Sequence, residues 1–184
     1  MEDWKSYWKS TQYVDDKKEK IEKLKTHIKS IPKNILDIGC GPAIESEYFQ
    51  KEYGSYLYLL DGNPHPNKNR TIRFGSVDTF NFYHDIETLK KDYDSRNLKY
   101  TFLDATGDVD LPEITFDFVY SFLSCGFHYP VSEYVPMLKY CTDENSLIMF
   151  DIRRHTFSDQ IKNFKEYEII YSENKKYYTV KVKL

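Results

Sequence analysis

The chain of 184 residues has the usual length of one domain and can bury a core without disulfides or metals. Its 26 Lys and Arg residues nearly balance 29 Asp and Glu residues, so the net charge of −3 lacks the basic character of a general nucleic-acid binder. Three cysteines at wide spacing, with no CxxC pair, favour reduced thiols and a cytoplasmic location. The apolar runs are too short for a signal peptide or a membrane span, so no membrane partner is expected.

The first segment, residues 2–30, is predicted to be helical. Apolar residues recur there at helical spacing between Lys and Glu residues: Ile21, Leu24, Ile28 and Ile31. Pro32 is expected to end this helix. Trp4, Tyr7 and Trp8 share an earlier helical face, which either forms part of a lid that excludes water from a substrate or packs against a sheet edge.

The rest of the chain alternates short apolar strands with helical stretches. Strands are predicted at residues 34–39, 56–61, 99–104, 116–123 and 146–152. Helices are predicted at residues 43–53, 83–94, 131–141 and 158–164. Alternation on both sides of ENKK makes residues 166–184 a terminal β-hairpin. This order predicts an α/β fold with a mostly parallel sheet of seven strands, covered on both faces and closed by an antiparallel hairpin.

We expect a single domain over residues 1–184. Residues 1–32 would form an N-terminal helical extension that covers the active site, and residues 33–184 would form the α/β core. No internal repeat or low-complexity linker divides the chain.

A glycine loop follows the first strand in ILDIGCGPA, residues 35–43. Gly39-x-Gly41 lets the chain turn sharply and lets its backbone approach a ligand. Asp61 and Asp104 close the next two strands, and ligands of open α/β sheets bind at these carboxyl ends. The alternative is that Asp37 and Asp104 cap turns and that residues 61–63 are ordinary turn residues.

The segment ILDIGCGPA resembles the first motif of class I S-adenosylmethionine-dependent methyltransferases. The resemblance runs from about Asn34 to the C-terminal hairpin and implies a Rossmann-like, doubly wound fold. It also implies S-adenosylmethionine as cofactor, with S-adenosylhomocysteine as product. Ala43 stands where the family often has a third glycine. A dehydrogenase motif fits less well because Ile44 is bulky, and no G-K-[ST] follows for a P-loop.

The resemblance carries cofactor contacts onto matching positions. It implies that the methionine part of the cofactor is lined by Asp37, Gly39 and Gly41. Asp61 would hold the ribose hydroxyls, followed at the cofactor by Gly62 and by Asn63 beside the adenine. Asp104 would accept from the adenine amino group, with Ala105 offering its backbone N–H. The methyl-transfer point would be bordered by Ser121 and Phe122.

The segment SFLSCGFHYP, residues 121–130, holds the candidate base. His128 lies just past the fourth strand, where the family places acceptor-binding groups, and an imidazole can accept a hydroxyl proton at neutral pH. The alternative is a histidine that contacts the cofactor or caps the helix near Val131. Tyr129 is expected to be a wall of the substrate pocket, and Cys125 a small packing residue.

Further substrate contacts are predicted after the fifth strand. Arg153 would clamp a carboxylate or phosphate, unless it belongs to a surface charge cluster. His155 is a second choice as base. Trp8 is a third substrate contact, as part of the lid. The sequence has no dense cluster of His, Cys and Asp, so no metal is expected.

The motifs narrow the acceptor. The segment after the fourth strand lacks the Asp/Asn-Pro-Pro-aromatic motif of DNA amino-methyltransferases and the Pro-Cys of cytosine-C5 enzymes. Its GFHYP looks similar to small bacterial sugar-type O-methyltransferases. The expectation is an enzyme, monomeric or homodimeric, that O-methylates a sugar, nucleotide-linked or phosphate-bearing metabolite, with surface polysaccharide as one destination. The alternatives are an N-methyltransferase of a small amine and an inactive, cofactor-binding partner subunit.

Overall fold

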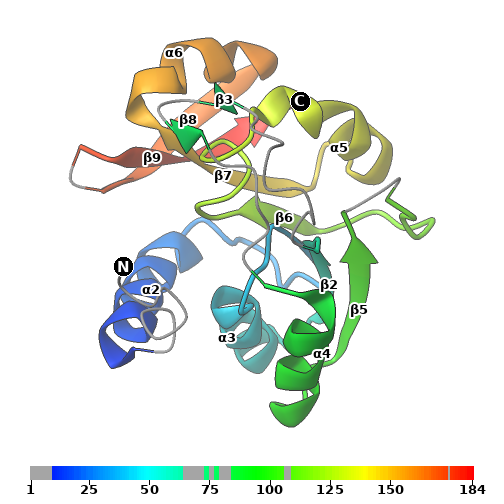
Figure 1. Cartoon of the computed structure of the whole chain (residues 1–184). Helices are drawn as coiled ribbons and strands as arrows, with labels where there is room; N and C mark the ends of the chain where they lie inside the picture. The colour runs from blue at the N-terminus through cyan, green and yellow to red at the C-terminus, as the bar shows by residue number, and fades with distance from the viewer. Residues whose placement is uncertain (1–9, 64–72, 75–76, 79–83, 106–108, 174) are drawn as a thin grey trace.

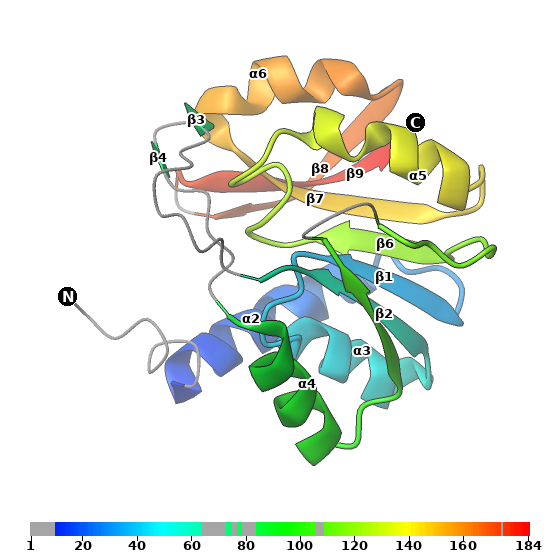
Figure 2. The same ribbon diagram turned by 45° about the vertical axis from the view of Figure 1, so that its right-hand side comes forward.

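A computed structural model describes residues 10–63, 73–74, 77–78, 84–105, 109–173 and 175–184. These residues contain a seven-stranded sheet in the order β5-β2-β1-β6-β7-β9-β8 (Figures 1 and 2). Its strands are β1 Asn34–Ile38, β2 Tyr56–Asp61, β5 Tyr100–Asp104, β6 Phe118–Ser121, β7 Leu147–Arg153, β8 Glu166–Glu173 and β9 Tyr177–Lys183. A separate antiparallel pair is formed by β3 Arg73–Phe74 and β4 Val77–Asp78.

The pairing of the strands confirms the predicted α/β, Rossmann-like fold. Strands β5, β2, β1, β6 and β7 run parallel, whereas β9 is antiparallel to β7 and β8 is antiparallel to β9. The chain starts near the centre at β1, winds outward to β2 and β5, and returns to β6 on the other side of β1. The carboxyl ends of β1 and β6 therefore meet where the winding reverses, which is where ligands of such sheets bind.

Helices cover both faces of the sheet. They are α2 Thr11–Lys25, α3 Ile44–Tyr53, α4 Ile86–Ser95, α5 Val135–Cys141 and α6 Phe157–Gln160, with 3₁₀ turns at Val131–Glu133, Arg154–Thr156 and Ile161–Asn163. Figure 2 shows α2, α3 and α4 below the sheet and α5 and α6 above it. No helix in the described part of the chain has the length and apolar character that a membrane span needs.

The two faces follow from the alternation of side chains along each strand. Ile35 of β1 packs in one core with Phe49 of α3 and Leu24 of α2. Its neighbour Leu36 packs in the opposite core with Leu138 of α5. Because both faces are covered, the central strands have apolar residues at nearly every position.

The N-terminal helix is shorter than predicted. It begins after Ser10, whose hydroxyl accepts the Tyr13 N–H at 3.2 Å, and it ends at Lys25, well before Pro32. Ile31 was predicted on its apolar face but is 70% exposed, so the helical pattern stops before that residue. Trp4, Tyr7 and Trp8 lie outside the described residues.

Two other boundaries differ from the predictions for local backbone reasons. The helix predicted over residues 131–141 divides into a 3₁₀ turn and α5, with Pro136 in the first turn of α5, where its missing N–H leaves no helical bond unmade. The strand predicted over residues 116–123 ends at Ser121, and Leu123 adopts a left-handed φ of 61°.

Helix α2 is anchored by a buried ion pair. Lys20 lies 2.7 and 2.6 Å from the two carboxylate oxygens of Asp151 in β7, and Asp151 is fully buried. The same carboxylate accepts the Thr179 hydroxyl at 2.6 Å and the Leu123 N–H at 3.2 Å. Burial lowers the pKa of Lys20 to about 8, and Asp151 opposes that shift. One carboxylate therefore joins α2, β7, β9 and the turn after β6.

Replacing Asp151 is expected to destabilise the fold strongly. Asp151→Asn leaves the Lys20 ammonium without its buried counter-charge, and the free energy of unfolding should fall by about 3–5 kcal/mol. Urea denaturation followed by circular dichroism measures this loss. Asp159→Asn is the matched control, because that side chain is 80% exposed, and it should change stability little. A loss in Asp151→Asn no larger than in the control would contradict this role of the pair.

Candidate functional site

The glycine loop after β1 runs through three left-handed residues. Gly39, Gly41 and Ala43 have φ values of 74°, 45° and 52°. The N–H groups of Gly39 and Cys40 both donate to the Leu60 carbonyl, at 2.7 and 3.1 Å. Alanine rarely adopts a left-handed φ, so Ala43 shows that contacts around the loop impose its conformation.

Gly39 is required by a close neighbour as well as by its φ. A Cβ at this position would lie 1.9 Å from Oγ and 2.3 Å from Cβ of Ser124, in the turn after β6. At Gly41 a Cβ would meet no atom of the described residues within 4 Å. Glycine is therefore needed at the two positions for different reasons. At Gly39 it lets the glycine loop contact the turn after β6, whereas at Gly41 it leaves open space beside the backbone.

Asp61 and Asp104 end adjacent strands at this edge. They are partners in the parallel register of β2 and β5. The two Asp61 carboxylate oxygens accept the N–H groups of Gly41 and Gly62 at 2.7 and 2.8 Å. Burial raises the pKa of Asp61 to about 6, and the two N–H donors oppose that shift. Because a carboxylate offers about four acceptor positions, two remain for further donors.

On the adenine side of the predicted site, one backbone donor already has a partner within the protein. The Ala105 N–H, expected to be offered to the adenine, donates at 2.8 Å to the Asp61 carbonyl and so continues the sheet pairing. Asn63 Oδ1 accepts the Ile86 N–H at 3.0 Å, at the start of α4. Asp104 is exposed and stands at the edge itself.

Three other predicted cofactor residues are buried beneath this edge. Asp37 accepts the hydroxyls of Ser46 and Tyr120 at 2.8 and 2.9 Å, and burial, followed by the Glu45 charge, raises its pKa to about 8. Ser121 donates to the Ile38 carbonyl at 2.6 Å and accepts the Cys125 N–H at 2.8 Å. Phe122 is also buried and stacks on Tyr120, with ring centres 4.6 Å apart. All three support the loops around the edge, and their contact with a cofactor stays a prediction.

His128 and Arg153 lie together on the other side of the edge. Arg153 Nε donates to the Phe127 carbonyl at 2.8 Å, and its guanidinium lies 3.9 Å from the centre of the Phe127 ring. The His128 ring meets the same phenyl ring edge-on, with centres 5.2 Å apart. Burial, together with the Arg153 charge, lowers the pKa of His128 to about 4. This imidazole is therefore neutral near pH 7 and is a weak base.

The turn that carries His128 is held by its own backbone. The His128 N–H donates to the Ser124 carbonyl at 2.6 Å, and the Gly126 N–H donates to the Tyr129 carbonyl at 2.7 Å. Gly126 has φ 87°, and a Cβ there would lie 2.7 Å from the Asp151 carbonyl oxygen. Tyr129 is partly buried beside His128.

A cavity of about 570 Å³ lies among α2, α3 and α4. Pro42 and Ile44 line it on the loop side, and Leu89 and Arg96 on the α4 side. The acidic strand ends and His128 are not among its lining residues. The cavity therefore lies in the helical layer next to Pro42 of the glycine loop, and the acidic strand ends do not line it.

The described residues include no cluster of three His, Cys, Asp or Glu side chains that could hold a metal ion. Cys40 and Cys125 are buried, and burial raises the pKa of both thiols. Protonated thiols are poor nucleophiles and poor metal ligands. Cys125 thus has the surroundings of a packing residue.

Several residues that support the site were absent from the sequence predictions. Tyr93 and Arg96 of the α4 segment donate to carbonyls of the glycine loop, and Lys20 holds Asp151. Lys20 did carry a signal, because Lys17, Lys20, Ile21 and Leu24 share one face of a helix at the spacing of a buried stripe. Tyr93 and Arg96 carried none, since their partners are about 50 residues away in sequence.

No protein-family model and no curated protein matches the sequence. Solved structures do resemble the fold. A methyltransferase from Pyrococcus furiosus has a TM-score of 0.61 at 12% identity, over 90% of this chain and 81% of that chain. Precorrin-6y C5,15-methyltransferase from Geobacter metallireducens GS-15 has a TM-score of 0.58 at 15% identity, over 94% and 88% of the two chains.

A third similar structure is ribosomal protein L11 methylase from Lactobacillus delbrueckii subsp. bulgaricus. Its TM-score is 0.58 at 10% identity, over 88% of this chain and 74% of that chain. At such identities the likeness shows the fold alone, and the names of these proteins point to different acceptors. The chain therefore has the fold of S-adenosylmethionine-dependent methyltransferases.

The two glycines of the loop should respond differently to alanine. Gly39→Ala is expected to lower the free energy of unfolding by about 2–4 kcal/mol, because left-handed strain is added to a clash with Ser124. Gly41→Ala meets only the strain and should lose about 1–2 kcal/mol. Urea denaturation compares the two variants, and Gly39→Ala with Ser124→Gly should recover the steric part. Equal losses in the two single variants would refute the proposed contact between the loops.

Proposed function

We propose that this protein is an S-adenosylmethionine-dependent methyltransferase of a small molecule. The observation that carries the proposal is the edge formed by the left-handed glycine loop and the paired carboxylates Asp61 and Asp104, on a sheet with the methyltransferase fold. S-adenosylmethionine supplies a methyl group on a positively charged sulfur, which is transferred by in-line displacement. The enzyme's part in such a reaction is mainly to align donor and acceptor.

The residues at the edge fit this cofactor chemically. Asp61 keeps two acceptor positions, which suit the two ribose hydroxyls. The space beside Gly41 lets a ligand lie close to the backbone. Asp104 ends the adjacent strand and is exposed, as a partner of the adenine amino group must be.

For the acceptor, we propose a hydroxyl on a sugar, nucleotide-linked or phosphate-bearing metabolite. Burial and, second to it, the Arg153 charge lower the pKa of His128, and a cation beside this imidazole favours an acceptor that brings negative charge. A phosphate near Arg153 would offset that cation and so remove the smaller of the two causes, while burial would still lower the pKa of His128. His128 would then take the proton of the acceptor hydroxyl as methyl transfer proceeds.

N-methylation of a small amine is the second candidate. It is favoured by the same low pKa of His128, about 4, because a neutral amine needs no strong base to react. A partner subunit without activity would bind the cofactor and methylate neither class of acceptor.

Cofactor affinity should depend on pH through Asp61. Its pKa is raised to about 6, so Asp61 is ionised above pH 6 and becomes protonated as the pH falls through that value. Protonation removes acceptor capacity, and affinity for S-adenosylhomocysteine should weaken by up to about tenfold per pH unit below 6. Isothermal titration calorimetry between pH 5 and 8 measures this dependence.

Asp61→Asn is expected to bind S-adenosylhomocysteine more weakly than wild type at pH 7.5, and with a flatter pH dependence. Asp159→Asn, an exposed carboxylate, should match wild type at every pH. Unaltered affinity in Asp61→Asn would rule out the ribose contact.

Turnover should distinguish the role of His128. His128→Ala is expected to keep its affinity for S-adenosylhomocysteine but to lose at least about 100-fold in turnover of a hydroxyl acceptor. His155→Ala tests the second-choice base in the same assay, and because that side chain is exposed this variant should stay near wild type. The assay follows S-adenosylhomocysteine release with panels of sugars, sugar nucleotides, phosphorylated metabolites and small amines.

The panel decides between the candidates. Normal turnover in His128→Ala would exclude His128 as the base. Turnover of amines alone would favour N-methylation. Binding without turnover of any acceptor, together with a co-purifying protein of fixed stoichiometry, would favour the inactive subunit.

A further inference from the structure

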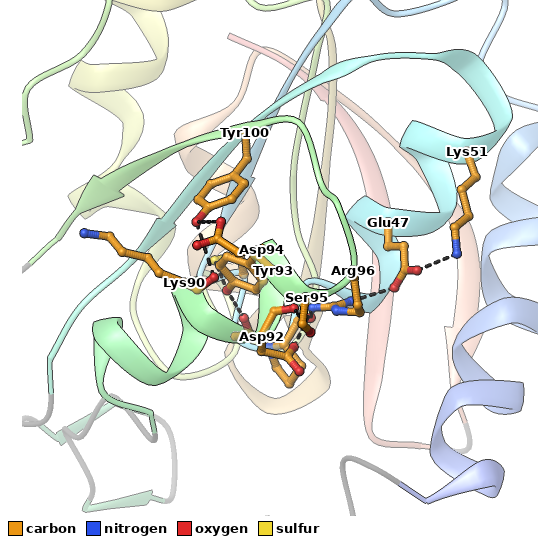
Figure 3. Close-up of polar contacts among 12 residues, drawn as sticks. Glu47, Lys51, Lys90, Asp92, Tyr93, Asp94, Ser95, Arg96 and Tyr100 are labelled. Carbon is orange, nitrogen blue, oxygen red and sulfur yellow. Dashed lines mark hydrogen bonds and ion pairs between the residues drawn. The ribbon is translucent and has the colours of Figure 1, made fainter.

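Helix α4 reaches back to the glycine loop through two side chains near its C-terminal end. The Tyr93 hydroxyl donates to the Gly41 carbonyl, and Arg96 Nη2 donates to the Pro42 carbonyl at 2.6 Å. Figure 3 shows Tyr93 and Arg96 close together at the end of α4. Two successive carbonyls of the loop are thus held by one helix that follows it by about 50 residues.

The direction of the Tyr93 bond is fixed by its surroundings. Tyr93 is fully buried, and burial, followed by the neighbouring Cys40, raises the pKa of its hydroxyl, which therefore stays protonated. Because the Gly41 carbonyl can only accept, Tyr93 must donate to it. Cys40 Sγ lies 3.4 Å from the same hydroxyl, so its thiol is left as the donor to the Tyr93 oxygen. The order of donation is Cys40 to Tyr93 to Gly41.

Arg96 is held in place by two carboxylates. Its Nη1 donates to Glu47 of α3 at 2.6 Å, and its Nη2 donates to Asp92 at 2.7 Å. Figure 3 shows Arg96 between Glu47 and Asp92. Because the guanidinium is fixed by two ion pairs, the second N–H of its Nη2 points in one direction, toward the Pro42 carbonyl. Arg96 therefore connects α4, α3 and the loop.

Gly41 is held by hydrogen bonds through both its N–H and its carbonyl. Its N–H donates to Asp61 at 2.7 Å, and its carbonyl accepts from Tyr93. The Asp61 carboxylate, which is proposed to bind the ribose hydroxyls, is thus hydrogen-bonded to the same residue that accepts from Tyr93. If Gly41 rotated, the Asp61 carboxylate would lose one of the donors that orient it.

We propose that Tyr93 and Arg96 are positioning residues that keep the glycine loop, and through it Asp61, in the conformation that binds the nucleoside part of the cofactor. This inference rests on the proposed cofactor. A loop with three left-handed residues has competing conformations, and a ligand that binds one of them loses affinity in proportion to the population of the others. Holding the loop from α4 raises the population that is competent to bind.

Tyr100 provides a matched control for a purely structural role of Tyr93 and Arg96. Tyr100 of β5 packs edge-on against Tyr93, with ring centres 5.2 Å apart, and its hydroxyl donates to Asp94 of α4 at 3.0 Å (Figure 3). The Tyr100 hydroxyl bonds to Lys90 and Asp94 of α4 and not to the glycine loop. Tyr100→Phe therefore removes a hydroxyl that is hydrogen-bonded to the same helix, and it leaves the bonds from Tyr93 and Arg96 to the glycine loop intact.

The test measures the Kd of S-adenosylhomocysteine by calorimetry at pH 7.5. Tyr93→Phe keeps the ring and removes the donor, and its Kd should rise about three- to tenfold. Arg96→Met should weaken binding by a similar factor, and Tyr100→Phe should stay within about twofold of wild type. Hydrogen exchange of the ligand-free proteins should show faster exchange at residues 39–43 in Tyr93→Phe than in Tyr100→Phe.

The outcomes separate this inference from the proposed function. Wild-type protein that does not bind S-adenosylhomocysteine overturns the cofactor and this assignment together. Wild-type binding that Tyr93→Phe retains undiminished overturns the assignment alone. Equal weakening in Tyr93→Phe and Tyr100→Phe also overturns it, because general packing of α4 would then be the cause.

Discussion

The buried carboxylate of Asp151 is the constraint on which the acceptor side of the molecule depends. It binds the Lys20 ammonium, the Thr179 hydroxyl and the Leu123 N–H, and so fixes the turn that leads to His128. Burying two charges is costly unless further contacts compensate. Here the ammonium also lies 4.0 Å from the centre of the Phe122 ring and 4.9 Å from that of Tyr177, and such cation–π contacts offset part of the lost hydration. Helix α2 is therefore an integral part of the fold and of the proposed site.

The cofactor side is organised by the same helical layer. Lys17 of α2 pairs with Glu45 in the first turn of α3. Arg96, which directly follows α4, pairs with Glu47, two residues further along α3. The start of α3, which follows the glycine loop directly, is thus held from both neighbouring helices. The strand edge therefore keeps its loops in place through polar contacts that are made beneath it.

The sequence predicts the features that are periodic or local. The mostly parallel sheet, the terminal hairpin and the positions of Asp61 and Asp104 at strand ends followed from strand alternation and from where each strand ended. Asp37 and Ser121 show the limit of such reasoning: position along a strand did not tell whether the side chain meets a ligand or a buried partner such as Ser46. Tyr93 and Arg96 could not be predicted, because a hydrogen bond to a carbonyl about 50 residues away leaves no local pattern. Trp8 lies outside the described residues, and its role stays a prediction.

The two halves of the edge differ in charge, and the proposed reaction uses that difference. Asp61 and Asp104 lie on the side of the proposed donor, whose sulfur is cationic before transfer and neutral after it. Arg153 lies on the side of the proposed acceptor, where a hydroxyl oxygen would gain negative charge as it loses its proton. A guanidinium there would stabilise that charge, but after burial it is also the second cause that lowers the pKa of His128 to about 4. An anionic acceptor would offset the Arg153 charge before the proton moves, and only the effect of burial on His128 would then remain. The Arg153 guanidinium beside His128 is thus the argument for the proposed phosphate-bearing acceptor over a neutral sugar.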